Sequence, residues 1–480
     1  MRNLSWRIVA GSCCLLLIAV AYAWTLDWQI SDTSDANLIV LRESRVLADG
    51  SVVAVGTYNS GGYQWDDLYL VKYGPNDTDK AEQIFDFPNM IVPAGNGSDF
   101  GTQLAVDESS GDIYVAGIAL VSDPFIGPTR KAYLKKFSGG LEPGTHIYVG
   151  SPYLEDDSAK LGTHMDVKVH EGYVFFAVTT KSLSNGNDIK LYKFNSSMAL
   201  QTGYPKTYAT ADDELAVDMV CYDDYVFVGG IQFGGSSDML ALRFDDDTTS
   251  PGPAWANSVD IGGAGEGPSS DTAVGIGLDY ADISESGDPN VFVGGHCTNG
   301  DADPEFDFAF AKFDYADGDV LDTQRLIDDD HDDQAVGLKT STADGSVLIA
   351  GTRRENEALN QGDRNYYVTQ FSHSSLDLLE EEEFGQTDLN EFAGSFTLDD
   401  GNAPWVFGLT SESSFATADE FLVLKLTDGL DPDGVFTFDV SGWSIQPLLG
   451  TVSSSGGAAY ALGTYGDGEG MNTLVAKFVD

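Results

Sequence analysis

Short apolar runs alternate with polar turns along this chain, and no 3.6-residue spacing of hydrophobic positions links one run to the next. The runs occur as a two-strand phrase that returns eight times at intervals of about 58 residues. Clear copies are Asn290-Val-Phe-Val-Gly-Gly with Asp307-Phe-Ala-Phe-Ala-Lys-Phe, and Ser346-Val-Leu-Ile-Ala-Gly with Asn365-Tyr-Tyr-Val-Thr-Gln-Phe. This pattern predicts a repeat protein built from short β-strands.

Each copy of the first strand ends at an equivalent position, which is occupied by Gly56, Gly117, Val178, Gly230, Gly295, Gly351, Gly408 and Gly463. Turn pairs such as Asp49-Gly50 and Asp344-Gly345 precede the phrase and are typical of tight hairpins. A further apolar stretch comes before each turn, and a looser strand follows the second phrase. Each unit therefore reads as four strands, which we name a to d in chain order.

A single four-stranded sheet of this composition cannot bury both of its apolar faces, whereas sheets stacked around an axis can. We therefore predict an all-β, eight-bladed β-propeller of four-stranded antiparallel blades, with seven blades as the alternative because the third unit is the most degenerate. The eighth unit lacks a strand d, and residues 25–30 form an unclaimed strand near the start. We expect this N-terminal strand to complete the last blade and close the ring, which also removes an exposed edge.

The runs Asp332-Asp-Gln-Ala-Val-Gly-Leu and Asp344-Gly-Ser-Val-Leu-Ile-Ala-Gly, followed by a polar loop and an Asp–Phe–Lys–Phe strand such as residues 307–313, resemble the SBBP-type β-propeller repeat family. The likeness covers nearly the whole chain after the leader. It implies a secreted or surface propeller without a defined reaction.

The first 23 residues have the layout of a signal peptide. Arg2 and Arg7 precede an apolar run from Ile8 to Ala21, and small residues stand at Ala21 and Ala23. We predict a signal peptide over residues 1–23 and a single propeller domain over 24–480, in a secreted or cell-surface protein. An uncleaved N-terminal membrane anchor is the alternative.

The net charge is −51, from 76 acidic and 25 basic residues, so nucleic acid and anionic membranes are not expected partners. A hydrophobic content of 42% argues against disorder. Cys221 and Cys297 are the cysteines outside the leader, and we expect them to stay unpaired because they fall at opposite ends of their strands.

A basic residue stands near the end of strand c in seven units, at Lys72, Lys136, Lys193, Arg243, Lys312, Lys425 and Lys477. Five positions earlier an acidic residue is common, as at Asp188 and Asp307. Five residues of strand place the two side chains about 17 Å apart and on opposite faces. We predict that the acid caps the incoming loop and that the cation contacts a neighbouring blade.

Acidic residues also stand just before strand a, and in a propeller this places them beside the central channel. Carboxylates crowded in this way take up protons or a cation, and oxygen ligands suit calcium. We therefore nominate a cation site, with Ca²⁺ as the ion, at Asp99, Asp157, Asp213, Asp271, Asp333 and Asp388. The alternative is general acidity with aspartate favoured in turns. The tract around His331 is open to the same two interpretations.

Arg353 and Arg354 are adjacent positive charges, which indicates either a surface salt bridge or contact with an anionic ligand. We assign no catalytic residue, because no nucleophile motif occurs and the many acids do not single out a pair. The sequence favours a non-catalytic binding scaffold whose variable loops contact an unknown protein or glycan ligand. An extracellular polysaccharide hydrolase or lyase on the same scaffold is the alternative.

Overall fold

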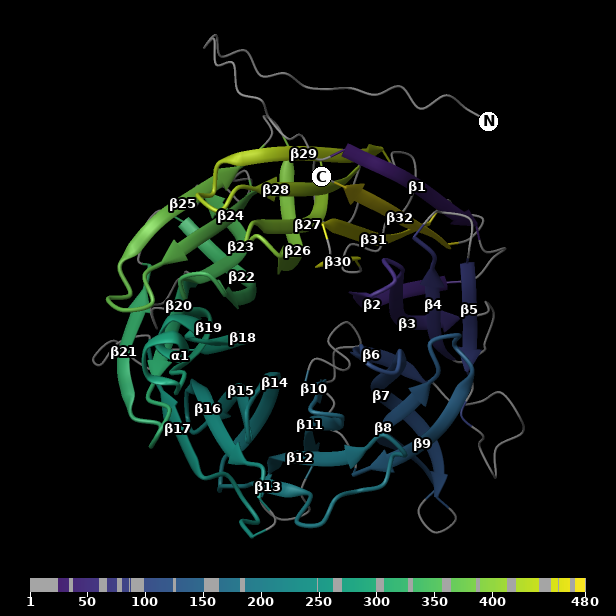
Figure 1. Cartoon of the computed structure of the whole chain (residues 1–480). Helices are drawn as coiled ribbons and strands as arrows, with labels where there is room; N and C mark the ends of the chain where they lie inside the picture. Colours follow the sequence, from purple (N-terminus) through teal and green to yellow (C-terminus); the bar gives the residue numbers. More distant parts are fainter. Residues whose placement is uncertain are drawn as a thin grey trace.

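The chain forms eight four-stranded antiparallel sheets arranged in a ring, so it is an eight-bladed β-propeller (Figure 1). This computed structural model describes residues 25–33, 38–59, 67–75, 80–85, 87, 99–123, 127–150, 164–181, 186–247, 249–261, 270–298, 306–326, 331–355, 364–385, 389–411, 420–439, 450–455, 457–466 and 471–479. The all-β, eight-bladed prediction is confirmed, and the seven-bladed alternative is excluded because the degenerate third unit is a complete blade.

Blades 1 to 4 run in chain order, and each has strand order a-b-c-d. Blade 1 comprises β2 (Leu38–Val46), β3 (Val52–Asn59), β4 (Asp67–Tyr73) and β5 (Lys80–Phe85). Blade 2 comprises β6 (Phe100–Asp107), β7 (Asp112–Asp123), β8 (Gly127–Phe137) and β9 (Pro143–Val149). Blade 3 comprises β10 (Met165–His170), β11 (Tyr173–Lys181), β12 (Asn187–Asn195) and β13 (Lys206–Tyr208). Blade 4 comprises β14 (Asp213–Tyr222), β15 (Tyr225–Phe233), β16 (Ser237–Asp245) and β17 (Trp255–Val259).

Blades 5 to 7 follow the same plan. Blade 5 comprises β18 (Asp271–Leu278), β19 (Val291–Thr298), β20 (Phe306–Phe313) and β21 (Val320–Arg325). Blade 6 comprises β22 (His331–Thr340), β23 (Val347–Glu355), β24 (Arg364–Phe371) and β25 (Leu378–Phe384). Blade 7 comprises β26 (Asn390–Leu398), β27 (Pro404–Ser411), β28 (Glu420–Leu426) and β29 (Pro432–Asp439).

Blade 8 combines both ends of the described chain. It contains β30 (Gly450–Ser455), β31 (Ala458–Gly466) and β32 (Met471–Val479), and its outer strand is β1 (Thr25–Thr33). β1 pairs antiparallel with β32 from Thr25 opposite Val479 to Thr33 opposite Asn472, and it lies along the outside of the ring (Figure 1). The prediction that the N-terminal strand closes the ring is therefore confirmed.

The repeated glycine of strand b has a steric cause. In six blades strand a contains a β-bulge directly opposite this glycine. A Cβ at Gly56 would lie 1.9 Å from the carbonyl oxygen of Val40, and one at Gly295 would lie 2.0 Å from that of Thr272. Blade 3 has Val178 at this position, and β10 begins in plain register at the Met165–Val178 pair. In these six blades the glycine is thus required by the close approach of the bulged strand.

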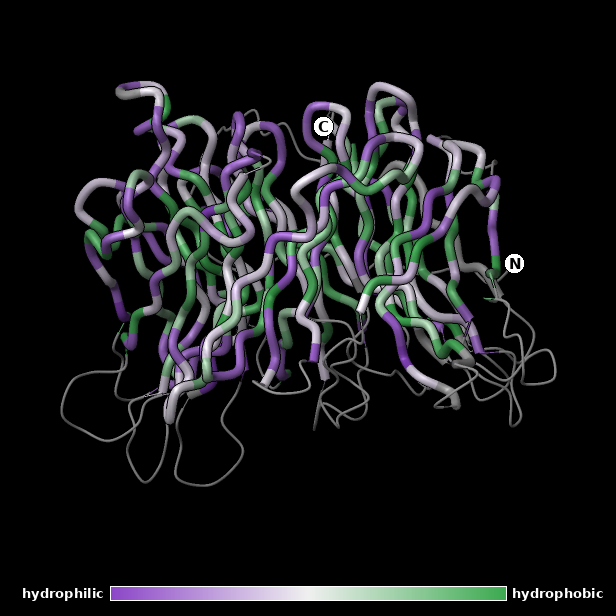
Figure 2. The backbone as a smooth tube through the Cα atoms, turned by 90° about the horizontal axis from the view of Figure 1, so that it is seen from below, coloured by the Kyte–Doolittle hydropathy of each residue, from purple (hydrophilic) through white to green (hydrophobic). Residues whose placement is uncertain are grey.

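The hydrophobic core lies between blades. One cluster joins Trp405 and Phe407 of blade 7 to Val452 and Phe478 of blade 8. Another joins blade 1 to blade 8 across the closure. In the side view the strands cross the thickness of the ring and their turns gather at its two faces (Figure 2). Each blade therefore buries its faces only against its neighbours, as the apolar character of both strand faces predicts.

Six of the seven strand-c cations link neighbouring blades, as predicted, whereas Lys425 pairs with Asp433 of its own blade. Lys136 Nζ donates to the carbonyl of Ser196 at 2.8 Å, and Lys312 Nζ to that of His373 at 2.9 Å. Equivalent links run from Lys72 to Gly139, from Lys193 to the Asp246 carboxylate, from Arg243 to Tyr315 and from Lys477 to Pro75. Every acceptor lies two residues after the last aromatic residue of strand c in the next blade. We call these six contacts the blade tethers.

The a–b connection of blade 5 contains the one helix in the described chain, α1 (Tyr280–Ser286), which the strand pattern did not predict. Asp279 caps its N-terminus, and Gly287 ends it with φ +87°. No helix among the described residues is long and apolar enough to cross a membrane. Cys221 and Cys297 are both free thiols, as expected.

Candidate functional site

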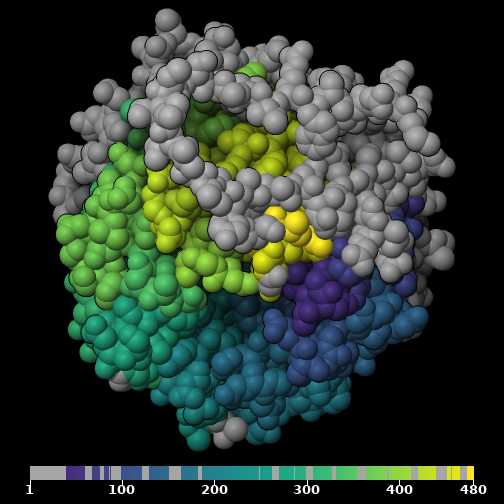
Figure 3. Space-filling model, turned by 45° about the horizontal axis from the view of Figure 1, so that its top comes forward, coloured from purple at the N-terminus to yellow at the C-terminus, as the bar shows by residue number. Residues whose placement is uncertain are grey.

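Strand a is the innermost strand of each blade, so the d–a and b–c ends of the blades share one face of the ring. We call it the entry face, and we call the face with the a–b and c–d turns the turn face. The centre of the ring is hollowed in the space-filling view (Figure 3). The four nominated aspartates within the described residues, Asp99, Asp213, Asp271 and Asp333, belong to the entry face.

Five blades carry a buried carboxylate at one shared position, two residues before the strand-a bulge. These residues are Asp99, Glu214, Asp271, Asp333 and Glu391, and each has a relative exposure of 0%. Burying a charge is costly unless it is paired or hydrogen-bonded, so the local partners decide what each carboxylate does.

Asp99 and Asp271 bind the chain as it enters from the preceding blade. Asp99 accepts from the backbone N–H of Phe87 at 3.0 Å and from that of Leu120 at 3.1 Å. Asp271 Oδ2 accepts from the N–H of Ile261 at 2.7 Å. Phe87 and Ile261 each lie two residues after strand d, so the two aspartates hold equivalent crossovers. Burial raises the pKa of Asp271 to about 7, and its Oδ1 has no hydrogen-bond partner.

The junction between blades 5 and 6 carries two acids that are neutralised by two arginines. Arg353 forms a bidentate pair with Asp333 at 3.0 and 2.9 Å. Arg325 binds Asp307, with Nε at 2.7 Å and NH2 at 2.6 Å from Oδ2. Burial raises the pKa of Asp333 to about 6, although the Arg353 hydrogen bond opposes this shift. The salt-bridge interpretation of Arg353 is thus the one that the geometry supports.

The junction between blades 3 and 4 has the same two acid positions without the arginines. Asp188 and Glu214 replace Asp307 and Asp333, and both are buried. Glu214 lies opposite Gln232 where Asp333 lies opposite Arg353. Thr207 occupies the strand-d position that is equivalent to Arg325. Thr207 pairs with Lys190, two residues after Asp188, and Arg325 pairs with Ala309, two residues after Asp307. These substitutions remove both arginines. Among the described residues, the one cation whose charge acts on Asp188 is Lys190, two residues further along the same strand.

Hydrogen bonds between their sequence neighbours, Asn187 and Asp213, hold Asp188 and Glu214 close to each other. Asn187 donates to Asp213 Oδ1 from its backbone N–H at 2.7 Å and from its side chain at 2.9 Å, which joins the starts of β12 and β14. Gly186 at φ +91° permits this approach, since a Cβ there would lie 2.5 Å from the Asp213 carboxylate. Asp188 Oδ1 and Glu214 Oε2 have no hydrogen-bond partner. Burial and the charge of Asp188 raise the pKa of Glu214 to about 7.

The nominated cation ligands therefore have different surroundings. Asp99, Asp271 and Asp333 are buried in the junctions of three different blades and bind separate partners. Asp213 is exposed and accepts a hydrogen bond from Asn187. The next residue, Glu214, occupies the buried position two residues before the bulge. Asp157 and Asp388 lie outside the described residues. The sequence tract 212–214 gave no sign of which acid is buried, because the bulge shifts the register of strand a.

The wall of the channel carries paired charges. Lys168 Nζ lies 2.6 Å from Asp166 and 3.4 Å from Asp218, so one lysine bridges strands a of blades 3 and 4. Glu43 pairs with Arg45 and accepts from the N–H of Leu104 in blade 2 at 2.5 Å. Burial raises the pKa of Asp166, and the charge of Lys168 opposes this effect. The channel wall thus neutralises much of its own charge.

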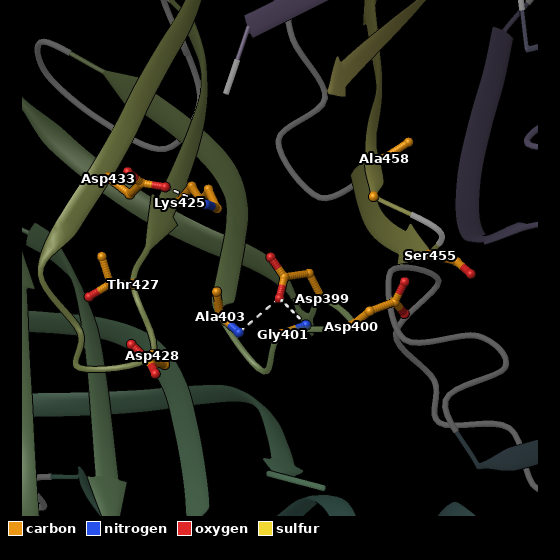
Figure 4. A pocket seen from close by; sticks show the side chains of 11 residues that line it. Asp399, Asp400, Gly401, Ala403, Lys425, Thr427, Asp428, Asp433, Ser455 and Ala458 are labelled. Carbon is orange, nitrogen blue, oxygen red and sulfur yellow. Dashed lines mark hydrogen bonds and ion pairs between the residues drawn. The ribbon is translucent and has the colours of Figure 1, made fainter. Parts of the chain in front are cut away.

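On the turn face an open cavity of about 380 Å³ lies between blades 7 and 8 (Figure 4). Its lining includes Asp399, Asp400, Asp428, Asp433 and Lys425, and Lys425 pairs with Asp433. Asp399 is bound internally, accepting from the N–H groups of Gly401 and Ala403 at 2.9 Å each. The residues lining this cavity include neither histidine nor aromatic side chains.

A second acidic group on the turn face comprises Asp279, Asp282 and His373, whose ligand atoms lie within 4.8 Å of one another. Lys312 already supplies a cation to this group, at 2.7 Å from Asp279 and 3.3 Å from Asp282. The group is therefore part of a blade tether.

No family model matches the chain, and no curated protein matches it. The resemblance to the SBBP-type repeat family stays a prediction. Among solved structures, the chain is similar to polysaccharide lyase Uly1, at 12% identity and a TM-score of 0.47 over 95% of this chain and 99% of that chain. It is also similar to the WD40 domain of SCAP from fission yeast, at 9% identity and a TM-score of 0.44 over 94% and 97%. The β-propeller domain of the trilobed protease from Pyrococcus furiosus matches at 9% identity and a TM-score of 0.39 over 85% and 95%. These likenesses assign no activity to this chain.

Proposed function

We propose that this protein is a secreted or cell-surface binding scaffold without catalytic activity, and that it binds calcium on its entry face. The observation that carries the cation site is the contrast between two equivalent junctions. Two arginines neutralise Asp307 and Asp333, whereas Thr207 and Gln232 stand in their places beside Asp188 and Glu214. A hard divalent ion would supply the missing positive charge through oxygen ligands.

The scaffold half of the proposal is supported by how the acids are used. A glycosidase or lyase needs acidic or basic side chains that converge on substrate in a pocket. In the described chain, Asp99 and Asp271 bind backbone N–H groups, and Asp333 binds Arg353. The cavity between blades 7 and 8 is open and is lined by small and acidic residues. These arrangements favour recognition over turnover.

The test of the cation site uses the full secreted chain, stripped with chelator and titrated with calcium by calorimetry and thermal unfolding. Calcium at a hundredfold excess over Kd should stabilise the fold by about 2.7 kcal/mol. The double variant D188N/E214Q should lose both binding and stabilisation. The matched control is D224N, which removes one exposed charge from the turn face of the same blade.

Equal calcium responses in D188N/E214Q and D224N would refute the site, because the ion would then be responding to overall charge. The scaffold half is tested separately by incubating the protein with neutral and acidic polysaccharides. New reducing ends or unsaturated sugars would refute the absence of catalysis, whatever the calcium result.

A further inference from the structure

Two arginines face each other across the hairpin of blade 6, at its entry-face end. Arg354 on β23 lies directly opposite Arg364 on β24. Cβ atoms of directly opposed residues lie about 4.5–5.5 Å apart in an antiparallel pair, and like charges in this arrangement destabilise the sheet. The chain has only 25 basic residues against 76 acids, so an arginine pair of this kind needs a reason.

The described side chains do not pair with either arginine. Within the described chain no ion pair or hydrogen bond is formed by the guanidinium of Arg354 or of Arg364, whereas Arg353 next to them binds Asp333 bidentately. Asp332 lies opposite Arg354 on β22, but its Oδ1 accepts from the backbone N–H of Phe306 at 3.0 Å. Among the described side chains of this row, one acid stands against two arginines, so these side chains carry excess positive charge.

Arg364 is also held in place. Its guanidinium carbon lies 4.8 Å from the centre of the Phe392 ring, which belongs to strand a of blade 7 and is buried. Contact with an aromatic ring uses the flat face of a guanidinium and leaves the N–H groups at its edge available. Burial and the charge of Arg354 lower the pKa of Arg364, although the charge of Asp332 opposes this shift.

We propose that Arg354 and Arg364 form a binding site for a single oxyanion, such as the carboxylate or sulfate group of a small acidic ligand. Two arginines side by side match the planar, bidentate geometry of these groups. The net charge of −51 repels a long polyanion, while a lone oxyanion meets only the local field of the pair. This site lies on blade 6 and does not depend on the calcium proposal.

The experiment measures thermal unfolding and calorimetric binding of the full chain at a constant ionic strength of about 0.1 M, which screens the distant acids, with sodium sulfate, sodium glucuronate or sodium chloride as probes. Sulfate and glucuronate should raise the unfolding temperature above the value in chloride. Binding of these probes should weaken at least tenfold in R354Q and in R364Q. Heparin, as a polyanion, should bind no better than glucuronate.

The matched control is R130Q. Arg130 is an exposed strand-c arginine near the corresponding hairpin of blade 2, and it lies opposite Leu120 instead of another arginine. R130Q should keep the full response to sulfate and glucuronate.

A second readout separates binding from folding. Without sulfate or glucuronate, R354Q should raise the unfolding temperature because it removes a repulsion. A lower unfolding temperature for R354Q in chloride would show that the arginine is already compensated, and would overturn the proposal. Equal responses to sulfate in R130Q and R354Q would also overturn it.

Discussion

The tether at Lys312 offers the sharpest test of how the blades are held together. Lys312 Nζ lies 2.7 Å from Asp279 Oδ2 and 2.9 Å from the carbonyl of His373 in blade 6. Asp279 has a relative exposure of 0%, and its other oxygen caps α1 through the N–H groups of Ala281 and Asp282. The lysine therefore neutralises a fully buried carboxylate and joins two blades with one ammonium group.

The substitution Lys312→Met keeps most of the aliphatic stem and removes the charge. It leaves the Asp279 carboxylate buried without its lysine, and losing one partner of a buried pair costs about 3–5 kcal/mol. The double variant K312M/D279N should lose only about 1–2 kcal/mol, because asparagine still caps the helix and carries no charge to bury. The double variant should thus be more stable than the single one.

Lys72→Met is the matched control at the same position of blade 1. The side chain of its partner Asp49 is 57% exposed, so solvent screens the pair and the loss should stay below about 1 kcal/mol. Equilibrium unfolding in urea, followed by tryptophan fluorescence, gives the three midpoints and slopes. Similar midpoints for K312M and K72M, or a double variant less stable than K312M, would refute the reasoning from burial.

Two further predictions concern Asp271 and the strand-b glycine. The pKa of Asp271 is raised by burial to about 7 in the folded chain from about 3.9 in the unfolded chain, so its contribution to stability falls as pH rises from about 4 to about 7. With chelator present, the urea midpoints at pH 5 and pH 8 should therefore differ less in D271N than in the unmodified protein. An equal difference in both proteins would contradict the raised pKa of Asp271. Gly295→Ala should destabilise by about 1–3 kcal/mol or more, because its Cβ would lie 2.0 Å from the Thr272 carbonyl oxygen. Gly394→Ala, with 3.7 Å to its nearest atom, should be tolerated in the same urea assay.

The ring of blades could be predicted from the sequence because the same strand pattern occurs eight times. Eight copies of one strand phrase average out local ambiguity, and a missing strand d at one end matches an unclaimed strand at the other. The strand-c cations were also predictable, since seven basic residues in register are conspicuous in so acidic a chain. Their acceptors all lie two residues after the last aromatic residue of strand c in the next blade. This position depends on how the blades stack, so it could not be predicted from the sequence.

The candidate site was less predictable, because it depends on neighbours that are distant in sequence. The acidic tract at 212–214 indicates the right place, but only the bulge decides that Glu214 and not Asp213 is buried. The difference between two junctions rests on Arg325 and Arg353 at one and Thr207 and Gln232 at the other, which are cross-strand relations. The helix α1 was not predicted because a helix of seven residues is too short to show a helical spacing of hydrophobic positions.

The pairing of β1 with β32 also sets the order of events when the chain is made. β1 is the first described strand to be synthesised, and its partner is the last. Blades 1 to 7 are able to form and stack as they emerge, each on the one before it, because their contacts are local in sequence. Blade 8 has to wait, so the growing protein carries two open edges until its final strand arrives. Slow synthesis or stalling near the end would prolong the period in which these edges can pair with other chains.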